Sequence, residues 1–258
     1  MAQAVSLREP LRKLTACATF NRMPDWFNVM SAGGTLAAGA LEALWDDGFV
    51  VIPGPVAPGA MVQLAAAYDA AVASAHPDDV AVGSTTTRVS DFVNRRPEFD
   101  SLYLYPPLLE ASCHVIGQPF KLSTMHARTV RPHTAAQALH VDFERDAQGW
   151  PMVGFILMVD EFRSDNGATR FVPGSHRMNA APSDDEGQVV ACGRAGSAII
   201  YNGSIWHGHA ANSSDKPRRS IQGAYIRREA ESGAKLPARM LPATLARIGP
   251  LARYLLAI

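Results

Sequence analysis

The sequence is poor in several features that point to particular classes of protein. Its three cysteines are scattered and form no C-x-x-C pair, so no disulfide framework is expected, which fits a reducing cytoplasm. Its net charge is zero, with 24 basic and 24 acidic side chains, so no overall charge attracts nucleic acid. No apolar run is long enough to cross a bilayer, and the N-terminus shows no secretory signal. These absences predict a cytoplasmic globular protein that binds neither nucleic acid nor membrane.

What is present is enough apolar sequence for a substantial core. Of the 258 residues, 47% are hydrophobic, and there are neither internal repeats nor low-complexity segments. We therefore expect a single domain over residues 1–258. Within it, residues 1–35 form an irregular N-terminal arm, residues 120–228 a β-rich core and residues 229–258 a C-terminal tail. The sequence does not indicate an oligomeric state.

The first half of the chain has the spacing of helices. Apolar periodicity predicts helices over 36–47, 58–76 and 106–116, and a buried strand over 49–53. Thr35 is a candidate N-cap of the first helix, and Gly117 is a candidate C-terminal cap of the third.

From Phe120 onward, short β-rich segments alternate with turn sequences. The predicted strands span 120–130, 137–143, 152–162, 168–175, 197–203, 205–210 and 218–228. Many short strands separated by turns are typical of a sandwich or barrel with helices packed outside it. The tail predicts two weak helices.

A possible metal site begins at His140-Val141-Asp142. On a strand, residues two apart face the same side, so both side chains could reach one ion. Imidazole and carboxylate ligands suit Fe(II), Mn or Zn, and the segment Trp206-His207-Gly208-His209 could supply a third ligand. Three protein ligands on one face leave open positions, as in non-haem Fe(II) oxygenases.

An arginine follows the second histidine segment at a suggestive distance. Arg218 lies eleven positions after His207, at the start of an apolar strand. A guanidinium binds a carboxylate through two parallel hydrogen bonds, so this site would suit a dicarboxylate co-substrate.

Several segments, in this order, resemble the phytanoyl-CoA dioxygenase family of Fe(II)- and 2-oxoglutarate-dependent oxygenases. The resemblance covers roughly residues 36–228. It rests on LWDDGFVVIPGPVAPGAM, RPEFDSLYLYPPLLEASCHVIGQPFKL, HVD, DNGATRFVPGSHR and GSAIIYNGSIWHGHAANSSDKPRR. The resemblance implies a mainly β fold, a double-stranded β-helix (jelly-roll, cupin-like) core with N-terminal helices packed on it. It also implies iron, 2-oxoglutarate and O2.

Matched residue by residue, the resemblance implies that His140, Asp142 and His207 hold the iron. Arg218 matches the arginine that binds the far carboxylate of 2-oxoglutarate, and Gln137 matches a polar position facing co-substrate or substrate. His209 is an alternative to His207, and Arg219 is an alternative to Arg218. No catalytic residue beyond the iron site is expected.

The expected reaction is hydroxylation of a small organic molecule, such as an amino acid or a specialised metabolite, with an acyl-CoA as the second choice. Desaturation, cyclisation and epoxidation would use the same ligands, whereas Asp142 argues against halogenation. Alternatives are a 2-oxoglutarate-independent metal enzyme on the same barrel, or a non-catalytic metal-containing binding barrel. Candidate substrate contacts, chosen for their closeness to the motifs, are Arg88, Phe92, Met125, Arg128, Trp150, Met158 and His209. Of these, Arg88 and Arg128 could bind a carboxylate or phosphate.

Overall fold

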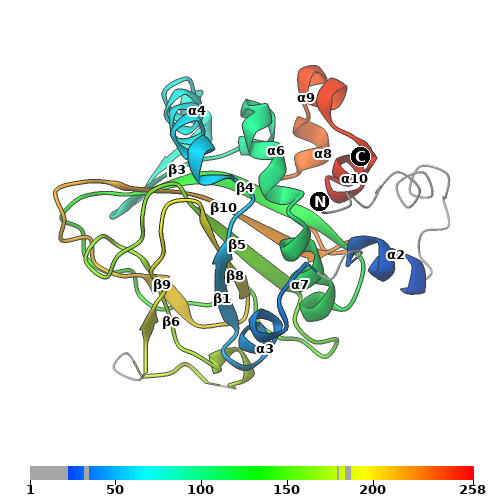
Figure 1. The fold of residues 1–258 in the computed structure, drawn as a ribbon, viewed down its shortest axis with the longest axis horizontal. Helices are drawn as coiled ribbons and strands as arrows, with labels where there is room; N and C mark the ends of the chain where they lie inside the picture. Colours follow the sequence, from blue (N-terminus) through cyan, green and yellow to red (C-terminus); the bar gives the residue numbers. More distant parts are fainter. Residues whose placement is uncertain (1–22, 32–34, 179, 184–186) are drawn as a thin grey trace.

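The computed structural model describes residues 23–31, 35–178, 180–183 and 187–258, and its central feature is a seven-stranded antiparallel sheet (Figure 1). The strand order is β1-β8-β5-β10-β4-β3-β2. In chain order these strands are β1 (Phe49–Pro53), β2 (Val80–Val82), β3 (Thr86–Val89), β4 (Phe120–Val130), β5 (Met152–Met158), β8 (Ser197–Asn202) and β10 (Arg218–Arg227).

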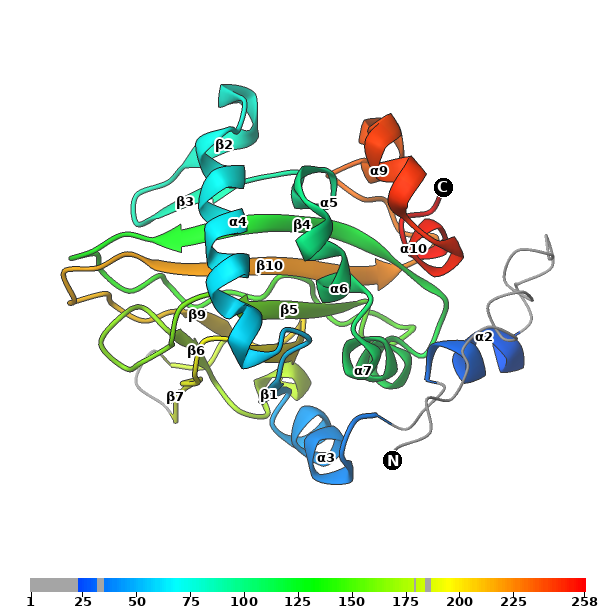
Figure 2. The same cartoon turned by 45° about the horizontal axis from the view of Figure 1, so that its top comes forward.

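A second, smaller sheet lies beside one face of the large one (Figures 1 and 2). Its order is β7-β6-β9, with β6 at Thr169–Phe171, β7 at Val189–Val190 and β9 at His207–His209. Residues of both sheets line one cavity, so the sheets face each other across it. Two facing antiparallel sheets with helices outside form the mainly β, jelly-roll architecture that the sequence predicted.

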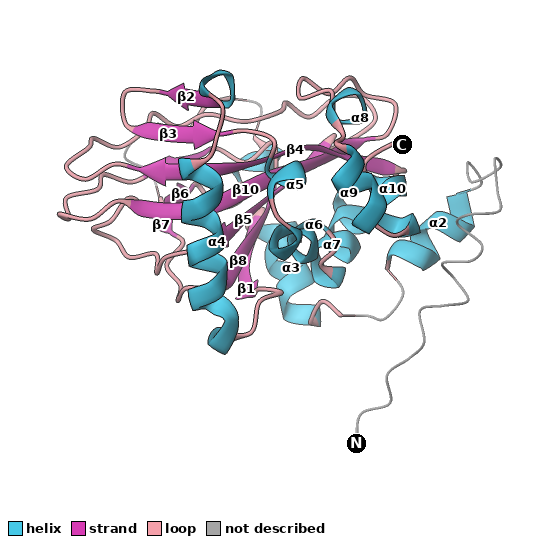
Figure 3. Ribbon diagram, turned by 90° about the horizontal axis from the view of Figure 1, so that it is seen from above, coloured by secondary structure: helices cyan, strands magenta, loops and turns pink. Residues whose placement is uncertain are grey.

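Helices cover the other face of the large sheet, as Figures 2 and 3 show for α4, α6 and α7. The helices are α2 (Met23–Met30), α3 (Ala38–Asp46), α4 (Met61–Ala73), α5 (Phe92–Arg95), α6 (Asp100–Tyr103), α7 (Pro106–Ile116), α8 (Leu236–Arg239), α9 (Pro242–Arg247) and α10 (Pro250–Leu255). Gly117 ends α7 with φ 63°, a conformation that glycine adopts without steric cost. The predicted cap is confirmed.

The alternation of side chains along β4 separates the core from the cavity. Met125 and Ala127 join the main hydrophobic cluster, which also contains residues of the covering helices. His126 and Arg128 point the other way and line the cavity. Because successive strand residues face opposite sides, one strand supplies both the apolar core and the polar cavity wall.

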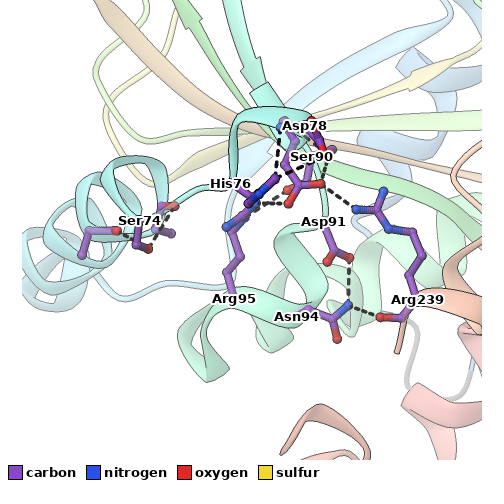
Figure 4. A network of polar contacts seen from close by, with 11 residues as sticks. Ser74, His76, Asp78, Ser90, Asp91, Asn94, Arg95 and Arg239 are labelled. Atoms are coloured by element: carbon purple, nitrogen blue, oxygen red, sulfur yellow. Dashed lines mark hydrogen bonds and ion pairs between the residues drawn. The ribbon is translucent and has the colours of Figure 1, made fainter. Parts of the chain in front are cut away.

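Polar contacts hold the C-terminal tail against the segment that follows β3. Figure 4 shows the Asn94 amide donating to Asp91 (2.8 Å) and to the backbone carbonyl of Arg239 (3.0 Å). Arg239 also forms a salt bridge with Asp79 (2.6 Å), which is shared by Arg95 (3.0 Å). The tail is therefore packed against the folded body.

Several sequence-based expectations were wrong in detail. The first helix begins at Ala38, with Ala37 as its N-cap, because the backbone amide and hydroxyl of Thr35 donate to Glu110 instead. Within the arm predicted to be irregular, α2 is helical, while residues 1–22 and 32–34 lie outside the described part. The large sheet also includes β1, β2 and β3, which lie outside the predicted core of residues 120–228.

The predicted strand over residues 137–143 does not form. The segment is a loop with a single β-bridge at His140 and a bend at Asp142 and Phe143. None of the described helices is long and apolar enough to span a membrane.

Candidate metal centre and cavity

His140, Asp142 and His207 come together at the edge of the smaller sheet. His140 pairs with His207, the first residue of β9, through two reciprocal backbone hydrogen bonds of 2.9 Å. The Asp142 amide donates to the Gly203 carbonyl (3.0 Å). In this position, Oδ1 of Asp142 lies 3.9 Å from Nε2 of His140, and Oδ2 lies 3.6 Å from Nε2 of His207. All three ligand atoms lie within 4.8 Å of one another, close enough to hold one ion.

Backbone carbonyls orient both imidazole rings. Nδ1 of His140 lies 3.2 Å from the Ala138 carbonyl oxygen, and Nδ1 of His207 lies 2.9 Å from that of Ile205. A carbonyl only accepts, so each Nδ1 donates to it, which leaves Nε2 as the nitrogen that can face an ion. Burial lowers the pKa of His207, which favours the neutral form that a metal ligand needs. Two imidazoles and a carboxylate are a ligand set that suits Fe(II).

Tyr201 on β8 orients the carboxylate. Its hydroxyl donates to Oδ2 of Asp142 (2.8 Å), and burial raises the pKa of Tyr201 well above its usual range, so the proton stays on the phenol. Gly154 lies opposite Tyr201 on β5, and a Cβ at Gly154 would overlap the tyrosine ring. The aromatic side chain therefore reaches Asp142 across a position where only glycine fits.

Arg218 lies in the wall of the same cavity. It is 1% exposed, stacks 4.0 Å above the Phe162 ring, and donates to the Gly167 carbonyl (2.5 Å) and to Oγ of Ser220 (3.1 Å). Its Nε is buried with no hydrogen-bond partner. Burial lowers the pKa of Arg218 to about 9. Among the described residues, no acidic side chain forms a salt bridge with this buried guanidinium, so it fits a carboxylate supplied by a ligand.

Arg219 faces the opposite side of β10. Its side chain forms salt bridges of 2.7 Å with both Asp160 and Asp69. Since its guanidinium already has carboxylate partners, Arg219 lacks the free binding capacity that Arg218 has.

The cavity that joins these features has a volume of about 220 Å³. Gln137 lines it and accepts a hydrogen bond from Arg128 through Oε1 (2.7 Å). Thr169 on β6 and Gln222 on β10 add polar groups that the sequence did not single out. The metal ligands and Arg218 thus share one polar cavity.

His209 also lines the cavity, but both ring nitrogens are engaged. Nδ1 lies 2.8 Å from the Ala210 carbonyl oxygen, and Nε2 lies 2.9 Å from Oγ1 of Thr85. It is not a member of the cluster that could hold a metal ion, in contrast to His207.

Of the other proposed substrate contacts, Arg88 and Arg128 line the cavity and four side chains lie elsewhere. Phe92 and Met125 belong to the core between sheet and helices, because their strand or helix faces point away from the cavity. Met158 packs in a second apolar cluster. Trp150 contacts Trp45 edge-on and donates to the His176 carbonyl (3.2 Å). Closeness in sequence misplaced these four residues.

Tyr201 was missed by sequence reasoning. A single tyrosine within an apolar strand has no local signal of function, since its contact with Asp142 depends on Gly154 of another strand.

Comparisons with known proteins indicate the family. Residues 44–220 match the family described as phytanoyl-CoA dioxygenase (PhyH). The dioxygenase cdmA of Talaromyces verruculosus is 44% identical over 73 residues, which cover 27% of this chain and 25% of that protein. The dioxygenase trt7 of Aspergillus terreus is 27% identical over 205 residues, 70% of each chain. The chain therefore spans between a quarter and about seven tenths of the length of these relatives.

A solved structure shares the fold. HygX from Streptomyces hygroscopicus, with nickel, 2-oxoglutarate and hygromycin B bound, superimposes with a TM-score of 0.64 at 18% identity, covering 75% of this chain and 88% of HygX. Since the family match spans more than half of the sequence, the chain belongs to the phytanoyl-CoA dioxygenase family of Fe(II)- and 2-oxoglutarate-dependent oxygenases.

Proposed function

We propose that the protein is an Fe(II)- and 2-oxoglutarate-dependent dioxygenase that hydroxylates a small organic molecule. His140, Asp142 and His207 hold the iron, and Arg218 binds the distal carboxylate of 2-oxoglutarate, with Gln137 beside it. The observation that supports this most strongly is the shared cavity. Its walls contain the His-Asp-His cluster and the buried Arg218, which forms no salt bridge with any described carboxylate. When bound, iron with 2-oxoglutarate and O2 supplies the oxidant for a C–H bond and releases succinate and CO2.

The residues of the chain hold the groups that supply this chemistry. The two carbonyl-anchored imidazoles and the Tyr201-anchored carboxylate fix three ligands on one side, leaving the other side open to co-substrate. Asp142 occupies the position that a halide would need, which favours transfer of oxygen.

The substrate class we favour is a small organic molecule, either an amino acid or a specialised metabolite. The relatives trt7 and cdmA are named dioxygenases, and HygX was solved with hygromycin B. An acyl-CoA is the second candidate. Comparing turnover of free acids with that of their coenzyme A thioesters distinguishes the two.

We further propose that residues 1–258 act as one domain, because Leu236, Ile248 and Leu255 of the tail belong to the main core cluster. We also propose that the protein is located in a reducing cytoplasm. This is supported by the free thiols of Cys113, which is buried, and Cys192, which is exposed.

The test is succinate release on addition of Fe(II), ascorbate and 2-oxoglutarate, with and without a metabolite library. We expect a metabolite-stimulated rate that is abolished in His140→Ala, Asp142→Ala and His207→Ala, each with weakened Fe(II) binding. Loss of metal binding in His209→Ala with retention in His207→Ala would reverse the ligand assignment. Substrate turnover that does not need 2-oxoglutarate would favour a different metal enzyme, and ligand binding without O2 consumption a non-catalytic barrel.

A further inference from the structure

Two arginines face each other on neighbouring strands of the cavity wall. Arg88 of β3 is the direct cross-strand partner of Arg128 of β4, and both line the cavity. Like charges directly opposite each other in a sheet destabilise it, so this arrangement has a cost unless an anion lies between or beside them.

Neither arginine has an acidic partner to offset that cost. Within the described ranges, no carboxylate forms a salt bridge with Arg88 or Arg128, in contrast to Arg219, which has two. Arg128 is 9% exposed, donates to the neutral amide of Gln137 (2.7 Å), and has a buried Nε without an acceptor. Burial and then the charge of Arg88 lower the pKa of Arg128 to about 10, so it stays protonated near neutrality.

The charge balance of the loaded cavity remains positive. Asp142 is the only acidic residue among the described side chains that line it, and it offsets one of its three arginines. The charges of Fe(II) and of the 2-oxoglutarate dianion cancel. Two positive charges are therefore left after both iron and co-substrate are in place.

We propose that the organic substrate is anionic and that Arg128, assisted by Arg88, binds its carboxylate or phosphate group. This inference rests on the proposed function, because it assigns Arg218 to 2-oxoglutarate. Arg88 is exposed and Arg128 is buried, so the pair leads from the surface to the interior of the cavity. Electrostatic attraction at the exposed end would guide an anion inward, and the buried guanidinium would then fix its orientation.

The test measures binding to protein loaded with Ni(II) and 2-oxoglutarate, which does not turn over. Isothermal titration compares benzoate and phenyl phosphate with the neutral benzamide, and the first two distinguish a carboxylate from a phosphate ligand. We expect the preferred anion to bind at least about tenfold more tightly than benzamide. That preference should vanish in Arg128→Gln, weaken in Arg88→Gln, and persist in Arg194→Gln, a matched change at an exposed arginine outside the cavity lining.

Equal binding of benzamide and both anions, no binding of either anion, or an unchanged preference in Arg128→Gln would overturn the inference. A fall of about tenfold or more in 2-oxoglutarate affinity in Arg128→Gln would also overturn it, because Arg128 would then belong to the co-substrate site. If the wild type fails to bind Ni(II) and 2-oxoglutarate at all, the proposed function itself fails, and the two failures are thereby distinguished.

Discussion

The hydroxyl of Tyr201 is a single group whose removal tests how the metal site is held. Its hydrogen bond to Asp142 fixes which carboxylate oxygen stays free for the ion. Contacts of this kind typically contribute 10–100-fold to metal affinity. We expect Tyr201→Phe to weaken Fe(II) binding by about tenfold while leaving the fold intact, as measured by anaerobic competition with a metal-sensitive dye.

Tyr105→Phe is the matched control, because the Tyr105 hydroxyl donates to the Pro53 carbonyl far from the metal ligands. Equal Fe(II) affinities in Tyr201→Phe and the wild type would show that the hydroxyl has no part in holding the site.

Arg218 makes a separate prediction for the co-substrate. Truncating one partner of a buried charged pair costs on the order of 2–5 kcal/mol, or roughly 30-fold or more in affinity. Arg218→Ala should therefore raise the Kd for 2-oxoglutarate by at least that factor and leave metal binding nearly unchanged. Arg219→Ala should break only the salt bridges with Asp160 and Asp69. If Arg219→Ala instead raises the Kd for 2-oxoglutarate and Arg218→Ala does not, then Arg219 is the residue that binds the co-substrate.

His126 makes stability depend on pH. Burial lowers its pKa to about 3 in the folded state, whereas an unfolded histidine titrates near 6.5. Below about pH 6.5 the unfolded chain therefore binds a proton that the folded chain does not, and stability falls by up to about 1.4 kcal/mol per pH unit. Between about pH 7 and about pH 5.5, the free energy of unfolding measured in urea should fall by about 1 kcal/mol less in His126→Gln than in the wild type. His76→Gln, at an exposed histidine, is the control.

At the scale of elements, the antiparallel pairing of β5 with β8 places Tyr201 opposite Gly154 and leaves no room there for a side chain. An added methyl group would overlap the Tyr201 ring. Overpacking of this kind costs about 1–3 kcal/mol. We expect Gly154→Ala to lower the free energy of unfolding by that amount and also to weaken metal binding, since Tyr201 must move. Gly39→Ala in α3, where nothing lies within 4 Å, should be neutral or stabilising.

Elements with a clear pattern of apolar residues were predictable from the sequence. The strand at Phe49–Pro53, the α7 helix and its Gly117 cap follow from apolar spacing and punctuation within one segment. The short β2, β3, α5 and α6 elements were not predicted, because segments of three or four residues are too brief to show a period. The failed strand around His140 shows a different limit. Its apolar alternation is real, but against β9 only His140 forms a bridge, with His207, and the Gln137 amide adds one hydrogen bond to the His209 carbonyl.

The candidate site was predictable to the extent that its residues are close in sequence or in motif order. His140, Asp142 and His207 could be identified from their motifs, and the structure brings them together. Tyr201 and Thr169 could not be identified, because their places in the cavity depend on how separate strands pair and how the two sheets face each other. Phe92 and Met125 were misplaced because the side of the sheet that a residue faces cannot be read from its distance to a motif.

At the scale of the whole molecule, the complete set of three protein ligands predicts which atom reaches the substrate. With Asp142 in place, the product should be oxidised and free of halogen, and a hydroxylated product should contain one oxygen from O2. Mass spectrometry under 18O2 with excess chloride measures this. A chlorinated product would contradict the assignment, whereas an unlabelled product two hydrogens lighter would indicate desaturation or cyclisation. Asp142→Gly should be nearly inactive, because it removes the only anionic protein ligand.

The reciprocal backbone pair between His140 and His207 also closes a loop whose ends lie 67 positions apart in the sequence (207 − 140 = 67). Holding the ends of such a loop together costs on the order of 4 kcal/mol of chain entropy. A bound metal would act there as a reversible cross-link, much as a disulfide does, and would suppress opening of the whole segment. The amide protons of His140 and His207, which form the two bonds, should therefore exchange with solvent far more slowly in the metal-loaded protein. Hydrogen exchange at these two amides would report metal occupancy without any substrate.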